Sequence, residues 1–456
     1  MKYSEKFKQY YPIRFKGIYT SRGDNDLVSV RIRQANRRDP SKWYTYQLEA
    51  LVKIASTMGN GKIHFTTRGD VELYGISASN LNKVLEILKE ADLDPQDSCG
   101  ASVRNVMPCP SYLCPFAKTN AVKVAMSIAE LFRHNQEYEY PKLPKRVKIT
   151  VSACEIGCAT PGIMDVGIVA KGEDKFDVYI GGGIGDHEFQ SVKLFENVSA
   201  REAMAISIAV ADLLKQENEK RGFKWVLNKY GEEKTKELIN EKIKELENKL
   251  EIKGENPDYL NYVKIIMVRT TGGWLTTDQV NEIIKVAKEN YDFVVLFNMQ
   301  TIFIPLKKNE FEIKGVDYEV LDSFPPKIRL VEACIGDDYC PPAVLSTTTV
   351  AENIEKILKE KGSKLRVYIS GCSHSCGRHQ IADIGLGAAM KNGKKVFKVY
   401  VGGGNYKIGK MIGEIDAEDY VELVDKISDI KNFDEQALTE KIKEIKSFRG
   451  DVNEEK

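Results

Sequence analysis

The chain lacks a large excess of charge of either sign. Its 456 residues carry 67 Lys and Arg against 66 Asp and Glu, which gives a formal net charge of +1. A nearly neutral chain has no overall field that attracts nucleic acid or an anionic membrane, so any anion site must be a local cluster of cations. We therefore expect neither nucleic acid nor a membrane among its partners.

Long hydrophobic runs are also missing. The most apolar candidate, residues 203–214, is about 12 residues long, whereas a membrane-spanning helix needs roughly 20. The first sixteen residues are rich in Lys, Arg and Tyr and have no apolar core of the kind found in a secretion signal. These absences predict a soluble, cytoplasmic protein.

Cysteines are the informative residues of this chain. There are nine, and eight of them fall into four close pairs. In a reducing cytoplasm, paired cysteines indicate metal ligation more than disulfides. The pairs are Cys109 with Cys114, Cys154 with Cys158, Cys334 with Cys340 and Cys372 with Cys376.

The two halves of the chain repeat each other. The segment Val151-Ser-Ala-Cys-Glu-Ile-Gly-Cys158 precedes Asp165-Val-Gly, and Ile369-Ser-Gly-Cys-Ser-His-Ser-Cys376 precedes Asp383-Ile-Gly. The offsets are 372 − 154 = 218 and 383 − 165 = 218, so no gap separates these landmarks. Glycine triplets then follow in both halves at 181–183 and 402–404. We infer a tandem duplication, with copies too long for a solenoid repeat.

Each copy has a mixed α/β pattern. Strands are predicted at 27–33, 62–67 and 70–75, and helices at 44–58 and 78–91, an order that resembles a ferredoxin-like half-domain. In copy two, strands at 262–269, 293–297 and 301–305 surround a helix at 278–290, and further helices are expected at 121–132 and 350–360. The predicted domains are half-domains at 1–92 and 256–325, Cys-bearing α/β domains at 93–214 and 326–430, a helical linker at 215–255 and a C-terminal helix and tail at 431–456.

Four thiolates from one copy suit either an iron–sulfur cluster or zinc. Cys334 and Cys340 are separated by five residues, a wider gap than structural zinc modules usually have, and the host domain is too large to need a metal for its core. Spacing alone therefore favours a cluster, with zinc and unligated thiols as alternatives.

The residues from Val331-Glu-Ala-Cys to Cys340, together with Ile369 to Leu386, strongly resemble the sulfite and nitrite reductases that contain sirohaem and a [4Fe-4S] cluster. The resemblance covers roughly residues 20–425. It implies an α+β, internally duplicated fold, with a ferredoxin-like half-domain followed by a sirohaem and cluster domain in each copy. It also implies that Cys334, Cys340, Cys372 and Cys376 hold a [4Fe-4S] cluster, and that Cys376 bridges to the sirohaem iron.

The resemblance further assigns the anion-binding residues. Arg33, Arg104, Arg146 and Lys148 match the cationic substrate positions of the family, and Arg68 matches an arginine that contacts the sirohaem carboxylates. Position 146 is commonly Lys in the family, so its Arg exchanges a movable proton donor for a permanent charge. The triplets Gly181, Gly182, Gly183 and Gly402, Gly403, Gly404 would let the backbone approach the macrocycle.

The copies are expected to divide the work. Copy one reads Thr66-Thr-Arg68 where copy two reads Asn298-Met-Gln300, and on the strand that matches Arg33 copy two keeps only Arg269. We therefore expect copy one to supply the cations and copy two the cluster, with no second working site. A second [4Fe-4S] cluster is expected at Cys109, Cys114, Cys154 and Cys158, with zinc or buried thiols without a metal as the alternatives.

These features predict a sulfite reductase that performs a six-electron reduction to sulfide. Lys148 stands where sulfite-reducing relatives tend to have Lys and nitrite-reducing ones Asn. Nitrite reduction to ammonia at the same site is the alternative, and an iron–sulfur electron-transfer protein without sirohaem or a zinc-stabilised binding protein are further ones. The chain shows no nucleotide-binding glycine motif, so electrons should come from a ferredoxin-type donor or a partner subunit.

Overall fold

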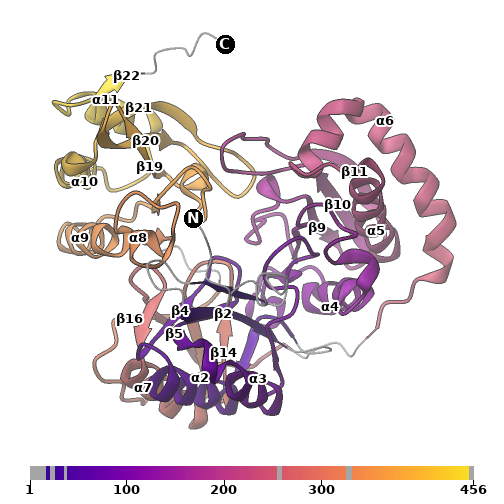
Figure 1. Ribbon diagram of the computed structural model, residues 1–456, viewed down its shortest axis with the longest axis horizontal. Helices are drawn as coiled ribbons and strands as arrows, with labels where there is room; N and C mark the ends of the chain where they lie inside the picture. The colour runs from indigo at the N-terminus through magenta and orange to yellow at the C-terminus, as the bar shows by residue number, and fades with distance from the viewer. Residues whose placement is uncertain (1–16, 21–25, 35–38, 254–258, 325–330, 451–456) are drawn as a thin grey trace. The chain divides into compact units, whose positions relative to one another are not determined.

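The computed structural model describes residues 17–20, 26–34, 39–253, 259–324 and 331–450, and the chain forms two compact units (Figure 1). The first unit contains residues 1–183, 189–270 and 274–325, and the second contains 184–188, 271–273 and 326–456. Arg37 and Arg38, which the sequence places beside Arg33, lie outside the described residues.

The first half-domain belongs to the first unit and is a sheet with two helices. All the strands and helices predicted for it are confirmed, with ends that differ by a few residues. Residues Leu81, Val84 and Leu88 of its second helix recur at helical spacing and are buried. Its elements are β1 (Ile18–Thr20), β2 (Leu27–Gln34), β3 (Lys42–Tyr44), α2 (Thr45–Met58), β4 (Lys62–Phe65), β5 (Val71–Ser77), η2 (Ala78–Asn80), α3 (Leu81–Glu90) and β6 (Leu93–Asp94).

The second half-domain repeats the strand, helix and hairpin of the first, has the strand β16 where the first has α3, and also lies in the first unit. Its predicted strands and helix are confirmed. Thr276 caps the helix, because its hydroxyl accepts the Gln279 N–H while the Gln279 side chain accepts the Thr276 N–H. Its elements are β12 (Lys264–Val268), β13 (Trp274–Thr276), α7 (Thr277–Lys288), β14 (Phe293–Leu296), β15 (Ile302–Leu306) and β16 (Tyr318–Leu321).

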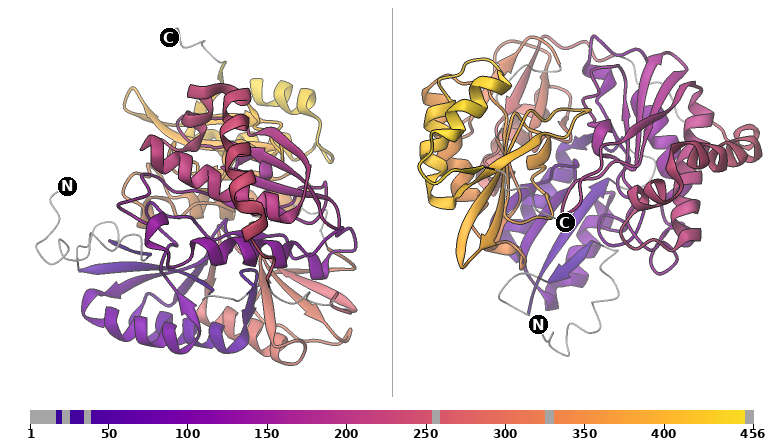
Figure 2. Two further views of the ribbon diagram at one scale, coloured as in Figure 1. Left: turned by 90° about the vertical axis from the view of Figure 1, so that its right-hand side faces the viewer. Right: turned by 90° about the horizontal axis from the view of Figure 1, so that it is seen from above.

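Each half-domain lends one strand to the other. β3 of copy one pairs antiparallel with β14, and β13 of copy two pairs antiparallel with β4. The two sheets have the strand orders β1-β2-β5-β4-β13 and β16-β12-β15-β14-β3. They lie side by side above α2, α3 and α7 (Figure 2). One apolar core contains residues of both copies, such as Leu48 and Ile283, so the two half-domains form one domain.

The Cys-bearing parts of the two copies are built alike. In copy one the order is β7-β8-β9-β10-β11, with β7, β8 and β9 parallel and the remaining pairs antiparallel. The second unit repeats it as β17-β18-β19-β20-β21, with β22 added at the edge. The register also repeats, because Ile149 faces Val166 as Val367 faces Ile384. The predicted duplication is therefore confirmed.

The remaining elements complete these two sheets. In the first unit they are β7 (Met107–Pro108), η3 (Ser111–Leu113), α4 (Ala121–Phe132), η4 (Gln136–Tyr138), β8 (Ile149–Ser152), η5 (Pro161–Ile163), β9 (Val166–Gly172), β10 (Lys175–Ile180), β11 (Val192–Val198), α5 (Ala200–Glu217), α6 (Phe223–Leu246) and η6 (Glu247–Lys249). In the second unit they are β17 (Val331–Ala333), α8 (Gly336–Tyr339), α9 (Thr347–Glu360), β18 (Val367–Ser370), η7 (His379–Ile381), β19 (Ile384–Lys391), β20 (Lys394–Val401), β21 (Lys410–Asp416), η8 (Ala417–Asp419), α10 (Tyr420–Ile427), α11 (Glu435–Lys443) and β22 (Arg449–Gly450).

The segment predicted as a helical linker is α6 together with the end of α5. α6 packs against α5 within the first unit and bends at Gly231, whose φ is 74°. The apolar run 203–214 lies in α5, where most of its side chains are buried. Across the described ranges, no helix is both long enough and apolar enough to span a membrane.

Candidate anion site and thiol sets

Six cations of copy one gather around two buried carboxylates of the first unit. Arg31 and Arg33 lie on β2, and Arg68 lies in the turn between β4 and β5. Arg104 precedes β7, and Arg146 and Lys148 precede β8. The positive charges of Arg31, Arg33, Arg68 and Arg104 act on the carboxyl group of Asp70. Those of Arg68, Arg146 and Lys148 act on the carboxyl group of Asp165. We call this group the cation cluster; its members are Arg31, Arg33, Arg68, Arg104, Arg146 and Lys148.

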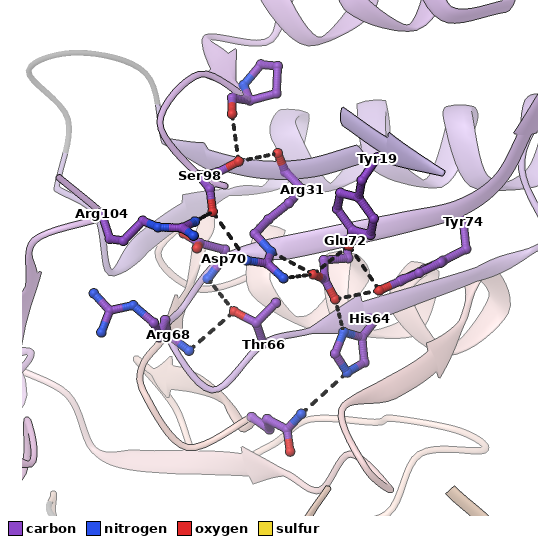
Figure 3. Close-up of polar contacts among 12 residues, drawn as sticks. Tyr19, Arg31, His64, Thr66, Arg68, Asp70, Glu72, Tyr74, Ser98 and Arg104 are labelled. Carbon is purple, nitrogen blue, oxygen red and sulfur yellow. Dashed lines mark hydrogen bonds and ion pairs between the residues drawn. The ribbon is translucent and has the colours of Figure 1, made fainter. Parts of the chain in front are cut away.

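One backbone carbonyl joins two of these guanidinium groups. Nη1 of Arg31 lies 3.3 Å from the oxygen of Ser98, and Nη1 of Arg104 donates to the same oxygen (Figure 3). The Ser98 hydroxyl in turn donates to the carbonyl of Arg31 at 2.9 Å. The loop before β7 therefore holds Arg104 against β2.

The cations of the cluster lie near enough to one another for their charges to act on Arg104. Burial, with the nearby charges of Arg31, Arg146 and Arg68, lowers the pKa of Arg104 to about 9. Burial also raises the pKa of Asp70 and that of Asp165, while the surrounding cations oppose the rise. A guanidinium whose charge is disfavoured gains from a bound anion, so the site is suited to a small oxyanion.

Arg33, which is expected to bind the substrate, forms a buried ion pair. Its side chain is 3% exposed, and its Nη2 lies 3.2 Å from Oδ2 of Asp97. Within the described residues, Nε of Arg33 and Oδ1 of Asp97 have no hydrogen-bond partner. Burial raises the pKa of Asp97 to about 6, against the lowering influence of Arg33. Arg33 is thus a buried, ion-paired cation.

The other predicted cations occupy less buried places. Arg68 donates from Nη2 to the carbonyl of Asn105 at 2.8 Å, and Asn105 donates to Asp70 at 3.0 Å. Arg146 is exposed, and Lys148 is half-buried just before β8. The backbone N–H of Lys148 donates to Oδ2 of Asp165 at 2.8 Å, which fixes the chain at the start of that strand.

Sequence reasoning missed a carboxylate behind Arg31. Glu72 of β5 lies 2.6 Å from Nε of Arg31 and 2.7 Å from Nδ1 of His64, and the hydroxyls of Tyr19 and Tyr74 each donate to it at 2.8 Å (Figure 3). Burial alone would raise its pKa, but Arg31 and the hydrogen bonds from His64 and Tyr19 hold it well below the usual value. A Glu at a buried position of a strand was the available signal, since such a residue needs partners.

Copy two has a cation that the comparison of the two sequence copies overlooked. The offset of 218 that relates the cysteines also places Arg366 at the position of Lys148. Arg366 Nη2 lies 2.6 Å from Oδ1 of Asp383 and 3.1 Å from the carbonyl of Gly403, and Arg269 pairs with Glu319. Arg269 and Arg366 of copy two are therefore each paired with a carboxylate.

The match of the two hairpin turns also needs correction by one residue. Phe65 faces Val71 across the first hairpin, and Leu296 faces Ile302 across the second, with equally long turns between them. This register makes Met299, instead of Gln300, the residue of copy two that is equivalent to Arg68. The physical reason is that strand pairing, which the sequence does not display, defines equivalence here.

In each copy the thiols lie close enough together to interact. Burial and the other three thiols raise the pKa of Cys340 to about 12, and the same causes raise the pKa of Cys109. The first set is buried, whereas Cys376 is exposed and the rest of its set is half-buried. The sets are Cys109, Cys114, Cys154 and Cys158 in the first unit, and Cys334, Cys340, Cys372 and Cys376 in the second.

One sulfur of each thiol set accepts a hydrogen bond from the backbone. Equivalent backbone N–H groups donate to sulfur in both sets, from Ala153 to Cys109 at 3.0 Å and from Gly371 to Cys334 at 3.1 Å. Such bonds are a common means of tuning cluster sulfurs. Among the residues that the structure describes, no three His, Cys, Asp or Glu side chains converge to hold one metal ion.

Most of the glycine-triplet positions are required by the fold itself. A Cβ at Gly182 would lie 2.8 Å from the Met164 nitrogen, and one at Gly403 would lie 2.5 Å from the Ile381 backbone. Gly181 and Gly402 have φ values of 78° and 82°. A Cβ at Gly183 would lie 3.0 Å from the Lys224 side chain, whereas one at Gly404 would meet nothing within 4 Å in the described structure. Close backbone packing therefore explains the middle glycine of each triplet without a macrocycle.

Two family models match the chain. The nitrite and sulphite reductase 4Fe-4S domain matches residues 99–246 and 325–444, which is more than half of the chain. The nitrite/sulfite reductase ferredoxin-like half domain matches residues 19–91.

Relatives of the chain carry both enzyme names. Sulfite reductase (ferredoxin) 1 of Mycolicibacterium paratuberculosis is 22% identical over 442 residues, covering 86% of this chain and 79% of the relative. The assimilatory ferredoxin-dependent nitrite reductase of Haloferax mediterranei is 21% identical over 487 residues, covering 88% and 78%. The structure of Mycobacterium tuberculosis NirA superposes with a TM-score of 0.76 at 17% identity, covering 95% of this chain and 90% of that one, which establishes the fold.

Proposed function

The chain belongs to the nitrite and sulphite reductase family, and on that premise we propose that it is a sirohaem-dependent enzyme that reduces sulfite to sulfide with six electrons. The observation that carries the proposal is the cation cluster. It supplies concentrated positive charge in a chain whose net charge is only +1. Burial and neighbouring cations lower the pKa of Arg104, and a bound anion would stabilise the charged form of this side chain.

Within the proposal, Arg104, Arg146 and Lys148 bind the oxyanion. Arginine holds two oxygens by parallel charge-assisted hydrogen bonds, and lysine donates one proton readily because its pKa responds to its surroundings. Lys148 is therefore assigned the delivery of protons to the oxygens that leave as water. Arg33, which Asp97 holds, contributes charge from behind the site.

The proposed cofactors are held by named residues of this chain. Arg68 would hold the sirohaem carboxylates, and the second thiol set would hold a [4Fe-4S] cluster. Sirohaem and cluster, when bound, supply the redox chemistry and store the electrons one at a time. A second cluster at Cys109, Cys114, Cys154 and Cys158 would act as a relay, and the electrons would come from a ferredoxin-type donor or a partner subunit.

Two other functions are supported by particular observations. Nitrite is also a small anion, and relatives at nearly equal identity carry either enzyme name. The eight cysteines in two similar sets equally suit an iron–sulfur electron-transfer protein without sirohaem. Both alternatives use the same fold and differ in what is bound and turned over.

A single preparation can test the proposal. Iron, acid-labile sulfide and extracted sirohaem are counted per chain, and turnover of sulfite and of nitrite is then measured with a reduced ferredoxin. We expect sirohaem, at least one cluster and the higher kcat/KM for sulfite. A cluster without sirohaem would support the electron-transfer protein, and a large preference for nitrite would replace the proposed substrate.

A further inference from the structure

A buried ion pair joins the two cysteine-bearing segments of the second unit. Glu332 on β17 stands two positions before Cys334, and Arg378 stands two positions after Cys376. Nη2 of Arg378 lies 2.6 and 2.5 Å from the two carboxylate oxygens of Glu332, and Nε lies 3.1 Å from the second of them. Glu332 is fully buried, and Arg378 is 5% exposed.

The backbone around this pair leaves little room for movement. A Cβ at Gly377 would lie 1.9 Å from the Ile369 carbonyl oxygen and 3.0 Å from the Cys334 nitrogen. The turn that carries Cys376 therefore lies directly on the segment that carries Cys334. Arg378 has a φ of 55°, and its guanidinium lies 5.6 Å from the centre of the Tyr368 ring. The pair thus fixes one cysteine turn to the other.

Copy one closes the equivalent turn without ions. Met107 faces Thr150 across β7 and β8 as Glu332 faces Tyr368 across β17 and β18. Thr160 takes the place of Arg378 and has nearly the same φ, 57°. This turn is held by uncharged groups.

The uncharged contacts of copy one are specific. The amide of Asn298 donates to the carbonyl of Cys158 at 3.2 Å and to the Thr160 hydroxyl at 3.4 Å. The Met107 side chain is fully buried beside them. A cysteine turn of this shape therefore needs no ion pair to fold.

A buried ion pair is a costly way to hold a turn. Its desolvation penalty often exceeds the attraction, so well-packed uncharged groups of similar size are commonly as stable or more stable. Nη1 of Arg378 also has no hydrogen-bond partner among the described residues. Stability alone therefore does not explain why copy two carries ions where copy one has Met and Thr.

We propose that Glu332 is a positioning residue of the second thiol set, which holds the Cys376 turn through Arg378 and cancels the guanidinium charge beside the cluster. The inference rests on the proposed function, because it takes the second set to hold a [4Fe-4S] cluster. Reduction adds negative charge to a cluster, and an uncompensated cation nearby favours the reduced form. Glu332 therefore keeps the reduction potential lower than Arg378 alone would allow.

Three variants of the full chain test this role. Glu332→Gln keeps the shape and removes the compensating charge. The double variant Glu332→Met with Arg378→Thr installs the residues of copy one and removes both charges. Asp429→Asn is the matched control, since it weakens an exposed ion pair with Lys361 in the same unit. Thermal unfolding is measured before cluster reconstitution, and the cluster potential is measured afterwards by EPR-monitored redox titration.

Glu332→Gln should lower the unfolding midpoint of the second unit by about 10 °C, because it leaves a buried guanidinium unpaired, and it should raise the cluster potential. The double variant should return both quantities towards the wild type, and Asp429→Asn should change neither. A wild-type potential in Glu332→Gln, or an equal rise in the double variant, would overturn the proposal. If Glu332→Gln does not fold, the cluster potential of the double variant is the deciding measurement. A potential close to the wild type supports the proposal, and a raised potential overturns it.

The failure of the proposed function would be recognised separately. A wild-type chain that takes up no cluster contradicts the proposed function. The unfolding midpoints of the same three variants then still report whether Glu332 holds the Cys376 turn, since that measurement needs no cofactor.

Discussion

At the scale of single residues, the candidate site depends on which cations form an ion pair with one carboxylate. Arg33 has Asp97, and Arg31 has Glu72, each within hydrogen-bond distance. Arg104 instead shares the field of Asp70 with other cations. Because Asp97 and Glu72 already pair with Arg33 and Arg31, we expect these two arginines to add little to anion binding.

Protonation of Asp97 should strengthen anion binding. Its pKa is about 6 in the folded chain against an ordinary value of 3.8, so its contribution to stability is fully present below the ordinary value and is lost as the pH rises through about 6. Once Asp97 is uncharged, it no longer offsets the positive charge of Arg33 at the anion site. We expect the affinity for nitrite, whose charge is constant over this range, to rise roughly fivefold as the pH falls through that value.

Spectral titration of the loaded enzyme with nitrite measures this effect. Asp97→Asn should bind at the higher affinity at every pH, while Asp92→Asn, which removes an exposed carboxylate that accepts a hydrogen bond from Tyr46, should keep the wild-type step. A step that survives in Asp97→Asn would assign the pH dependence to another group.

Lys148 should decide between the two anions. Lys148→Asn removes the proton donor and should lower kcat/KM for sulfite by about 100-fold, with a much smaller loss for nitrite. Lys142→Asn is the control, because Lys142 is exposed and pairs with Glu137 away from the cation cluster. Equal losses for both anions would show that Lys148 contributes only charge.

At the scale of elements, the reciprocal exchange of β3 and β13 makes each half-domain incomplete without the other. Trp43 of β3 is fully buried, and Val294 beside it on β14 is also buried. β3 and β13 each directly precede a helix of their own copy, α2 and α7, so separating the half-domains would strip a strand and part of the core from both.

We expect the fragment 1–95 to remain unfolded in isolation and to fold when it is mixed with the fragment 256–325. The reason is that β4 loses its neighbour β13 and the shared core loses 14 of its 34 buried residues. Far-ultraviolet circular dichroism and urea titration measure this. Cooperative unfolding of fragment 1–95 alone would show that the exchanged strand is dispensable.

At the scale of the whole molecule, the two compact units have separate cores. Leu48 lies in the core of the half-domains and Leu386 in that of the second unit, and both are fully buried. Truncating either should cost about 3 kcal/mol, from lost burial and the cavity left behind. We therefore expect two transitions in denaturant, with Leu48→Ala moving one midpoint and Leu386→Ala the other. A shift of both midpoints by either variant would contradict independent units.

The sequence by itself determined the duplication, the order of helices and strands, and the residues in the thiol sets. These properties depend on local periodicity and on motifs that repeat at a constant offset, which can be read without knowing the fold. The site cations were instead assigned through the resemblance to the reductase family.

Only the tertiary structure decided how those residues are partnered. The strand exchange depends on which strand edges meet, and a three-residue strand such as β3 carries too little pattern to show its neighbour. The pairings of Arg33 with Asp97, Arg31 with Glu72 and Arg378 with Glu332 join residues 41 to 64 positions apart. Whether a cation is neutralised depends on distance in space and on burial, and neither property is written in the order of the residues.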